Sequence, residues 1–292
     1  MTLVWRGMTQ AQLDAAYDQA AYAPNMQAVL ARYASRSDAV RKRVGDPQRL
    51  AYGDNEKERL DLFSPPLADD LLSINIFVHG GAWRSGEAKN YAFPAELFLN
   101  AGAHFIAIDF DWVQNQQGDL LAIADQVRRA IAWVAKHAPE FGGDPERLHL
   151  SAHSSGAHLA AVALSTDWHS QFGLPRDIIK SALLCSGIYD MEPVRLSARS
   201  SYVMLTDDSA QALSPMRHLD RITTKATIAY GSNETPEFQR HSQELSEALL
   251  ANGRQVDLVV GDDLNHFEIL ETLADPDGLL GRATLALMEL ES

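Results

Sequence analysis

From residue 72 onward, almost continuous apolar runs alternate with longer amphipathic stretches. This alternation constrains the fold more than any other feature of the sequence. The segments "SINIFVHGG" at 73–81 and "HFIAIDF" at 104–110 have the composition of strands buried on both faces. Residues 119–137 instead repeat apolar side chains every three or four positions, which predicts a helix. Because strands that alternate with helices form parallel sheets through right-handed crossovers, we expect an α/β fold with a mostly parallel central sheet and helices on both faces.

The chain before this region has a different pattern. Residues 1–46 predict helices, and Thr9 with Gln12 resembles a capping box at the start of the first. Residues 48–53 and 58–63 alternate apolar and polar side chains, as half-buried strands do. No helix separates these two strands, so they should open the sheet in antiparallel fashion. We expect one domain over 1–292, with an N-terminal helical extension at 1–46 and a cap or lid at 193–222.

Charge and cysteine content exclude some classes of protein. The 292 residues carry a formal net charge of −14 and no basic run, which argues against a nucleic-acid partner. Cys185 is the only cysteine, so no internal disulfide can form, and a reducing compartment is favoured. No signal peptide and no stretch of 18 apolar residues is present. We expect a soluble cytoplasmic protein with a small-molecule substrate, no metal or cofactor and no membrane partner; a homodimer is left open.

A strand, a sharp turn and a helix are predicted in "RLHLSAHSSGAHLAA" at 147–161. Its "AHSSG" matches the small-x-Ser-x-Gly pattern of a nucleophile elbow, with alanine in place of the usual first glycine. Ser154 would be the nucleophile, exposed above the sheet by a strained backbone. Ser155 falls at the helix start, where its backbone N–H can donate to an oxyanion. His153 and His158 flank the turn and are expected to pack or form hydrogen bonds.

The glycine pair in "HGGAW" at 79–83 follows a predicted strand. It resembles the loop that supplies further oxyanion donors in α/β-hydrolases. Glycines let backbone N–H groups point into a site at low steric cost. We expect the N–H groups of Gly81 and Ala82 to face the oxyanion, and His79 to be a structural hydrogen-bonding residue.

The remaining members of a catalytic triad should follow in the order Ser, acid, His. His266 in "DDLNHFEIL" follows the last predicted strand and is the candidate general base. Glu234 in "IAYGSNETPEF" follows the preceding strand and is the favoured acid, which would orient the imidazole. Asp190 is a rival candidate for the acid, but its position is more simply explained as that of a turn residue. Glu237 is a second rival, and its charge suits a helix N-terminus.

With these residues identified, the chain resembles the kynurenine formamidase (arylformamidase) branch of the α/β-hydrolases. The resemblance covers most of the chain and rests on "LAYGDNEKERLDLF", "HGGAW", "HSSGAHLA", "CSGIYDMEPV", "LSPM", "GSNETPEF" and "NHFEILETL". It implies the α/β-hydrolase fold, with Ser154 as nucleophile, Glu234 as acid and His266 as base. Glutamate stands where the family often has aspartate, and "DWVQNQQ" replaces its more usual Tyr-Arg-Leu-type loop.

The resemblance implies hydrolysis of a small amide or ester through an acyl-enzyme, with an aryl formamide such as N-formylkynurenine as the leading substrate. Trp83, Trp112 and Phe267 stand beside catalytic segments and could stack on an aromatic substrate. The alternatives are a carboxylesterase, an amidase or a carbamate hydrolase, because the same elbow and loop serve them all. A non-catalytic binding protein on this fold is a further alternative, although such proteins usually lack a triad member.

Overall fold

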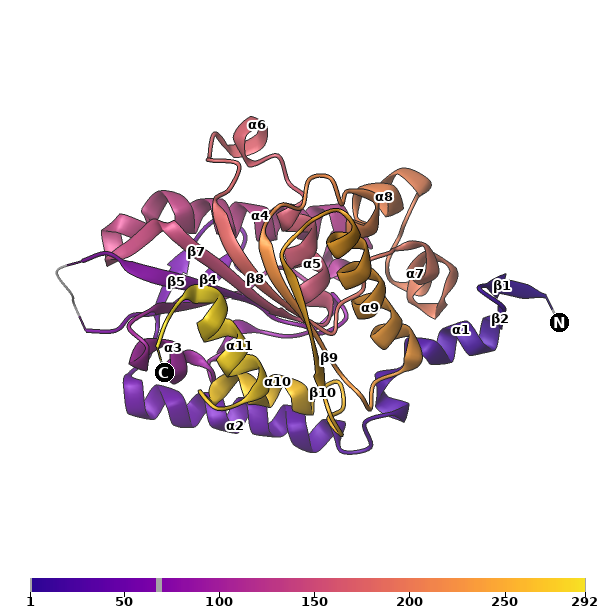
Figure 1. The fold of residues 1–292 in the computed structure, drawn as a ribbon, viewed down its shortest axis with the longest axis horizontal. Helices are drawn as coiled ribbons and strands as arrows, with labels where there is room; N and C mark the ends of the chain where they lie inside the picture. Colours follow the sequence, from indigo (N-terminus) through magenta and orange to yellow (C-terminus); the bar gives the residue numbers. More distant parts are fainter. Residues whose placement is uncertain (1, 67–69, 292) are drawn as a thin grey trace.

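An eight-stranded mixed sheet forms the centre of the molecule in the computed structural model, which describes residues 2–66 and 70–291 (Figure 1). The strand order is β10-β9-β8-β7-β5-β6-β4-β3. Every neighbouring pair from β10 to β6 is parallel, whereas β4 is antiparallel to β6 and β3 to β4. The mostly parallel sheet and its antiparallel start are therefore confirmed. The strands are β3 (Gln48–Ala51), β4 (Arg59–Phe63), β5 (Leu72–Val78), β6 (His104–Ile108), β7 (Gly143–His153), β8 (Ile179–Cys185), β9 (Lys225–Gly231) and β10 (Val256–Gly261).

Helices cover both faces of this sheet, as expected. Successive residues of β5 point to opposite faces: Ile76 belongs to the apolar core on one face and Phe77 to the core on the other. The first core is closed by α4 (Leu120–His137), α5 (Ser155–Leu164) and α9 (Pro236–Ala251). The second is closed by α2 (Met26–Val44), α3 (Ala95–Asn100), α10 (Glu268–Glu271) and α11 (Leu279–Met288).

The N-terminal extension is only partly helical. Its capping box at Thr9 and Gln12 is present and opens α1 (Gln10–Ala16), which is followed by the 3₁₀ turn η1 (Gln19–Ala21) and by α2. The prediction of helices from residue 1 is wrong at the start, where β1 (Leu3–Trp5) pairs with β2 (Met8–Thr9). The turn between them has positive φ at Arg6 and Gly7, which favours a tight hairpin. Figure 1 shows this hairpin projecting at one end and α2 running along the lower edge of the molecule.

The segment 193–222, expected to be a cap or lid, contains short helical pieces that pack beside the N-terminal extension. Gln10 donates a hydrogen bond to the backbone oxygen of Leu196, and Asp14 accepts one from the backbone of Ala198. A lid function for this segment stays a prediction. Its elements are α7 (Glu192–Leu196), η5 (Ala198–Ser201), α8 (Asp207–Ala212) and η6 (Pro215–Arg217); elsewhere lie α6 (Trp168–Phe172), η2 (Ala88–Tyr91), η3 (Val113–Gln116), η4 (Ala138–Phe141) and η7 (Thr272–Ala274).

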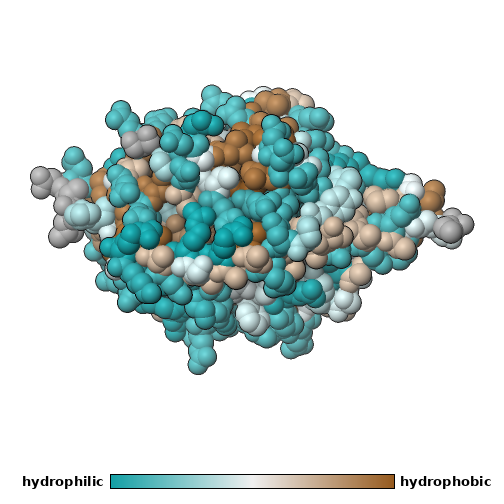
Figure 2. Space-filling view, turned by 90° about the horizontal axis from the view of Figure 1, so that it is seen from below, coloured by the Kyte–Doolittle hydropathy of each residue, from teal (hydrophilic) through white to brown (hydrophobic). Residues whose placement is uncertain are grey.

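One face of the molecule can be seen in a space-filling view. The face at the bottom of Figure 1 is mostly hydrophilic, with smaller hydrophobic groups between the polar side chains (Figure 2). Within 2–66 and 70–291, no helix is both long and apolar enough to cross a bilayer.

A charged cluster joins the antiparallel edge of the sheet to the loop that follows β5. Arg49 on β3 contacts Asp61 on β4 and Asp109 just after β6, each at 2.6 Å. Both carboxylates are buried, and burial raises the pKa of Asp61 despite the guanidinium beside it. Asp109 also accepts the backbone N–H of Ala88 at 2.6 Å, so it anchors the segment that follows the glycine pair.

We expect Arg49→Met to lower the free energy of unfolding by about 2–3 kcal/mol at pH 7. This loss lies at or below the lower end of the range that is typical when one partner of a buried ion pair is removed, because Arg49 is itself half-exposed. Without the guanidinium, burial would raise the pKa of Asp61 further in the folded state, so the loss of stability should shrink as the pH falls toward 5. Urea denaturation at both pH values measures this. Arg43→Met, which breaks an exposed pair with Glu96, is the matched control, and an equal loss in both variants would contradict the account.

Buried neutral histidines should make the fold sensitive to acid. Burial lowers the pKa of His149 and of His158 to about 4, whereas an unfolded histidine titrates near 6.5. Below pH 6.5 the unfolded chain therefore binds more protons, and stability falls as the pH falls toward 4. Each group should remove about 1.3 kcal/mol of unfolding free energy between pH 7.5 and 5.5. Urea denaturation of the wild type and of His149→Gln tests this, since the variant should lose correspondingly less; identical pH dependence in the two proteins would refute it.

Candidate active site

Ser154 occupies the sharp turn between β7 and α5. Its backbone has φ = 58° and ψ = −126°, a strained conformation for a residue with a side chain. The turn packs tightly against the end of β5: a Cβ on Gly156 would lie 2.1 Å from the backbone oxygen of Val78. Only glycine fits there, so the "AHSSG" pattern is explained by this close approach. The turn lifts the Ser154 hydroxyl clear of the strand ends.

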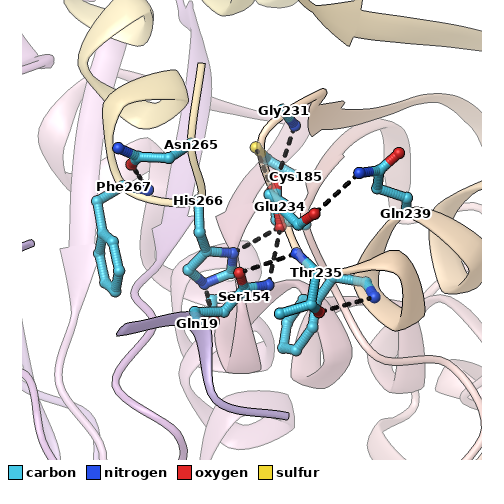
Figure 3. Close-up of polar contacts among 12 residues, drawn as sticks. Gln19, Ser154, Cys185, Gly231, Glu234, Thr235, Gln239, Asn265, His266 and Phe267 are labelled. Atoms are coloured by element: carbon cyan, nitrogen blue, oxygen red, sulfur yellow. Dashed lines mark hydrogen bonds and ion pairs between the residues drawn. The ribbon is translucent and has the colours of Figure 1, made fainter. Parts of the chain in front are cut away.

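Three side chains from the loops after β7, β9 and β10 meet above the sheet edge (Figure 3). The Ser154 hydroxyl lies 2.8 Å from Nε2 of His266, and Nδ1 of the same ring lies 2.7 Å from Oε2 of Glu234. With the ring proton on Nδ1, the imidazole donates to the carboxylate and accepts from the hydroxyl. The structure thus brings together the hydroxyl, imidazole and carboxylate that the sequence had singled out.

Glu234 is buried, and hydrogen-bond donors meet both of its carboxylate oxygens. Oε1 accepts from the hydroxyl of Ser186 at 2.5 Å and from the backbone N–H of Gly231 at 2.7 Å. Oε2 accepts from His266 and, at 3.3 Å, from the side chain of Gln19. Such a set of donors stabilises an ionised carboxylate away from water.

The two rival acids have other partners. Asp190 accepts the backbone N–H of Glu192 at 3.1 Å, as a turn residue does. Glu237 pairs with Arg240 in the first turn of α9 at 2.7 Å. Neither is hydrogen-bonded to His266, so of the three candidates only Glu234 has the required contact.

Ser186 and Gln19 are members of this site that the sequence analysis missed. Ser186 directly follows β8 and has φ = 56°, so it turns its hydroxyl toward Glu234. Its place at the carboxyl end of a parallel strand was an available signal. Gln19 comes from the N-terminal extension, and nothing in the local sequence links it to a residue more than 200 positions away.

The backbone after β5 forms a turn with open N–H groups. Gly81 has φ = 122°, and Ala82 has φ = 53°. Among the residues that the structure describes, no acceptor bonds the N–H groups of Gly81, Ala82 or Ser155. Ser155 also ties the loop to the elbow, because its hydroxyl accepts the backbone N–H of Trp83 at 3.2 Å. The three expected oxyanion donors are therefore free to bind a ligand.

The other histidines near the elbow have structural hydrogen bonds, as expected. His153 bonds the backbone oxygen of His266 at 2.7 Å, and burial holds its pKa well below the usual range. His158 accepts from the indole N–H of Trp83 at 3.1 Å and bonds a backbone oxygen on its other side. His79 stacks on Phe110 with ring centroids 4.4 Å apart. Neutral, fixed rings of this kind position the loops around Ser154.

Cys185 lies beneath the site and is buried. Burial, with the nearby Glu234 carboxylate, raises the pKa of its thiol, so the thiol stays protonated. We therefore interpret Cys185 as a packing residue. In the part of the chain that the structure describes, no group of three or more His, Cys, Asp or Glu side chains could hold a metal ion.

A cavity of about 300 Å³ opens beside Ser154 and His266. Phe267 lines it, as expected for a substrate-binding aromatic, whereas Trp83 and Trp112 do not. Trp83 is 1% exposed because its indole is turned inward to His158. Trp112 is turned away by a hydrogen bond to Gly86 at 3.0 Å and by contact with Lys57. The structure thus corrects the substrate-binding assignment of both tryptophans.

The N-terminal extension and two arginines supply the wall that the sequence analysis missed. Met26, Leu30 and Tyr33 recur at helical spacing on one side of α2, inside the extension that was expected to be helical. Part of that apolar side faces the cavity. The complete lining is Gln19, Met26, Leu30, Tyr33, Gly81, Ala82, Arg84, Ser85, Tyr91, His153, Ser154, Arg199, His266 and Phe267.

Comparisons with known proteins agree with this arrangement. The BD-FAE family model matches residues 60–181. A crystal structure from Silicibacter sp. TM1040 superposes with a TM-score of 0.80 at 24% identity, covering 94% of this chain and 98% of that one. An esterase from Thermogutta terrifontis superposes with a TM-score of 0.65 at 21% identity, covering 84% and 91%. These neighbours share the α/β-hydrolase fold.

Sequence relatives match most of the chain. The chain is 30% identical to a kynurenine formamidase of Danio rerio over 295 residues, covering 97% of this chain and 98% of that protein. It is also 29% identical to an isoprenylcysteine alpha-carbonyl methylesterase of Arabidopsis thaliana over 256 residues, covering 78% and 57%. The match to the first is end to end and spans the helical extension as well as the sheet. The chain therefore has the α/β-hydrolase fold and belongs to the kynurenine formamidase family.

Proposed function

We propose that this hydrolase cleaves aryl formamides, N-formylkynurenine among them, by a serine mechanism with Ser154, His266 and Glu234 as the triad. The observation that carries the proposal is the unbroken chain of hydrogen bonds from the Ser154 hydroxyl through His266 to Glu234. A serine hydroxyl is a weak nucleophile at neutral pH and needs an adjacent base that is held in one tautomer. The other three donors to Glu234 hold its carboxylate in place, and the carboxylate orients that base.

The reaction proceeds in two halves. The Ser154 oxygen attacks the formyl carbon while His266 takes the hydroxyl proton at Nε2. The C–N bond then breaks, and His266 returns the proton to the leaving nitrogen, which departs as the arylamine. Water attacks the formyl ester on Ser154, giving its proton to His266. Formate leaves, and Ser154 regains the proton.

Backbone donors stabilise the charge that forms on the carbonyl oxygen in each half. The N–H groups of Gly81, Ala82 and Ser155 are free of other acceptors, and Ser155 begins α5, whose N-terminus carries partial positive charge. Loss of a single such donor typically costs about 10²–10³ in rate. Since the donors are fixed by the backbone, they need no rearrangement during the reaction.

An ester is the second candidate substrate. The same triad and donors act on esters, and relatives named as a methylesterase and as a carboxylic ester hydrolase match large parts of the chain. The formamide is preferred because the match to the kynurenine formamidases is end to end, whereas the chain spans about half to three fifths of those ester hydrolases.

We expect Ser154→Ala to lower kcat by about 10⁴-fold or more, because the nucleophile is lost while the fold is kept. Ser155→Ala is the matched control. It keeps Ser154 and its own backbone N–H, and should lose less than about tenfold. Turnover of an aryl formamide with circular dichroism of each variant measures both effects. Full activity of Ser154→Ala would end its assignment as nucleophile.

Substrate preference separates the two candidate functions. We expect formanilide to be cleaved with a kcat/KM at least about tenfold above that of acetanilide, since one extra methyl group in an acyl site is worth about 10- to 200-fold. Release of formate and of the arylamine is measured for formanilide and N-formylkynurenine, with p-nitrophenyl acetate in parallel. Rapid hydrolysis of the ester with no turnover of either formamide would make the protein an esterase.

A further inference from the structure

Two arginines on the wall of the active-site cavity lack an acidic partner. Arg84 and Arg199 both line the cavity that contains Ser154. Within the ranges 2–66 and 70–291, no carboxylate oxygen lies within 4.0 Å of either guanidinium. The chain has a net charge of −14, so acidic groups are abundant elsewhere. Two unneutralised cations at one cavity therefore create a local positive potential in an otherwise acidic protein.

Arg199 is held in place without being neutralised. One of its nitrogens donates to the backbone oxygen of Tyr17 at 3.0 Å. The guanidinium carbon lies 5.4 Å, 5.6 Å and 5.9 Å from the ring centroids of Tyr17, Trp83 and Phe238. Phe238 in turn packs against the ring of His266, with centroids 5.0 Å apart. These contacts fix the guanidinium close to the catalytic imidazole and leave several of its five N–H donors without a protein acceptor.

Arg84, in the loop after β5, is the second arginine on the wall of the active-site cavity. It is exposed and stacks on Tyr202, with its guanidinium carbon 4.5 Å from the ring centroid. Arg84, Arg199 and Ala82 also line a second cavity of about 420 Å³, so the two cavities adjoin at these residues. A ligand longer than the acyl group would reach them from Ser154.

The acidic side chains of that second cavity are already engaged. Asp14 accepts the backbone N–H of Ala198 at 2.7 Å, and Asp18 accepts that of Ala20 at 3.0 Å. Both carboxylates keep their charge but are hydrogen-bonded to backbone donors, and neither lies within 4.0 Å of the two guanidinium groups. The N–H donors of the two arginines therefore remain available to a ligand.

We propose that Arg199 and Arg84 form an anion subsite that binds a carboxylate carried by the leaving group of the substrate. The inference rests on the proposed function, because a formyl group is the smallest acyl group and the rest of the substrate must extend along the cleft. Arginine suits this task, since its planar fork matches a carboxylate. The subsite selects aryl formamides that carry a carboxylate over those that lack one.

The test compares a substrate that carries a carboxylate with one that lacks it, in single variants. N-formylkynurenine carries a carboxylate beside its α-ammonium group, and its carboxamide keeps the aryl formamide and the ammonium group without the carboxylate. We expect the wild type to prefer the carboxylate-bearing substrate, and Arg199→Gln to lower kcat/KM for that substrate about 10- to 100-fold more than for the carboxamide. The loss should appear mainly in KM. Arg84→Gln should act in the same direction, and Arg199→Lys should restore part of the preference.

Controls separate this role from a structural one. Arg282→Gln removes an exposed arginine on α11 that lines neither cavity, so it corrects for net charge. Equal losses on both substrates would make Arg199 a purely structural residue and overturn the proposal. A wild type that does not distinguish the two substrates would overturn it as well.

A failure of the proposed formamidase activity can be distinguished from a failure of the anion subsite. If the wild type cleaves esters but no formamide, 3-(4-acetoxyphenyl)propanoate and its carboxamide replace the formamides, with the same variants. A carboxylate preference that depends on Arg199 would then support the subsite alone. Absence of that dependence would refute the subsite too.

Discussion

The close approach of α5 to the end of β5 is the constraint on which the site depends. A Cβ on Gly156 would meet the backbone oxygens of Val78 and His79, so only glycine lets the helix begin there. That contact holds Ser154 at positive φ and sets the N–H of Ser155 beside the loop after β5. The proposed nucleophile and oxyanion donors are thus placed by one packing contact between backbone segments. The strain at Ser154 persists because the surrounding sheet overdetermines it.

Glu234 connects this core to the N-terminal extension. Its carboxylate receives donors from the strand ends, at Gly231 and Ser186, and from Gln19 in the extension. The backbone N–H of Thr235 returns a hydrogen bond to Gln19 at 3.3 Å. Because a buried carboxylate is costly unless its oxygens are paired, the extension contributes to the electrostatics of the triad. The extension is therefore part of the active site as well as a cover for the sheet.

Interactions that are local in sequence could be predicted, and those that join distant segments could not. The elbow, the glycine pair and the alternation of strands with helices each leave a pattern within fifteen or twenty residues, which is why Ser154, Gly81 and His266 were identified. The orientation of Trp83 could not be predicted, because it depends on the partner that His158 provides 75 positions later. The same holds for Gln19 and for the cavity side of α2. The hairpin at 3–9 was missed because its turn signal lies in only two residues.

Residues inside the match to the family model and residues outside it also contribute differently to the proposed chemistry. The family model covers residues 60–181, which contain the proposed nucleophile and oxyanion donors, whereas Glu234, His266, the extension and Arg199 lie outside it. The proposed mechanism needs Ser154 and its oxyanion donors together with the acid and base that later segments supply. The extension and Arg199 instead shape the wall of the cleft, and Arg199 reaches that wall while bonded to the backbone of Tyr17 in the extension. Under the proposed function, the wall residues thus bear on which substrate binds, and the triad bears on the reaction at Ser154.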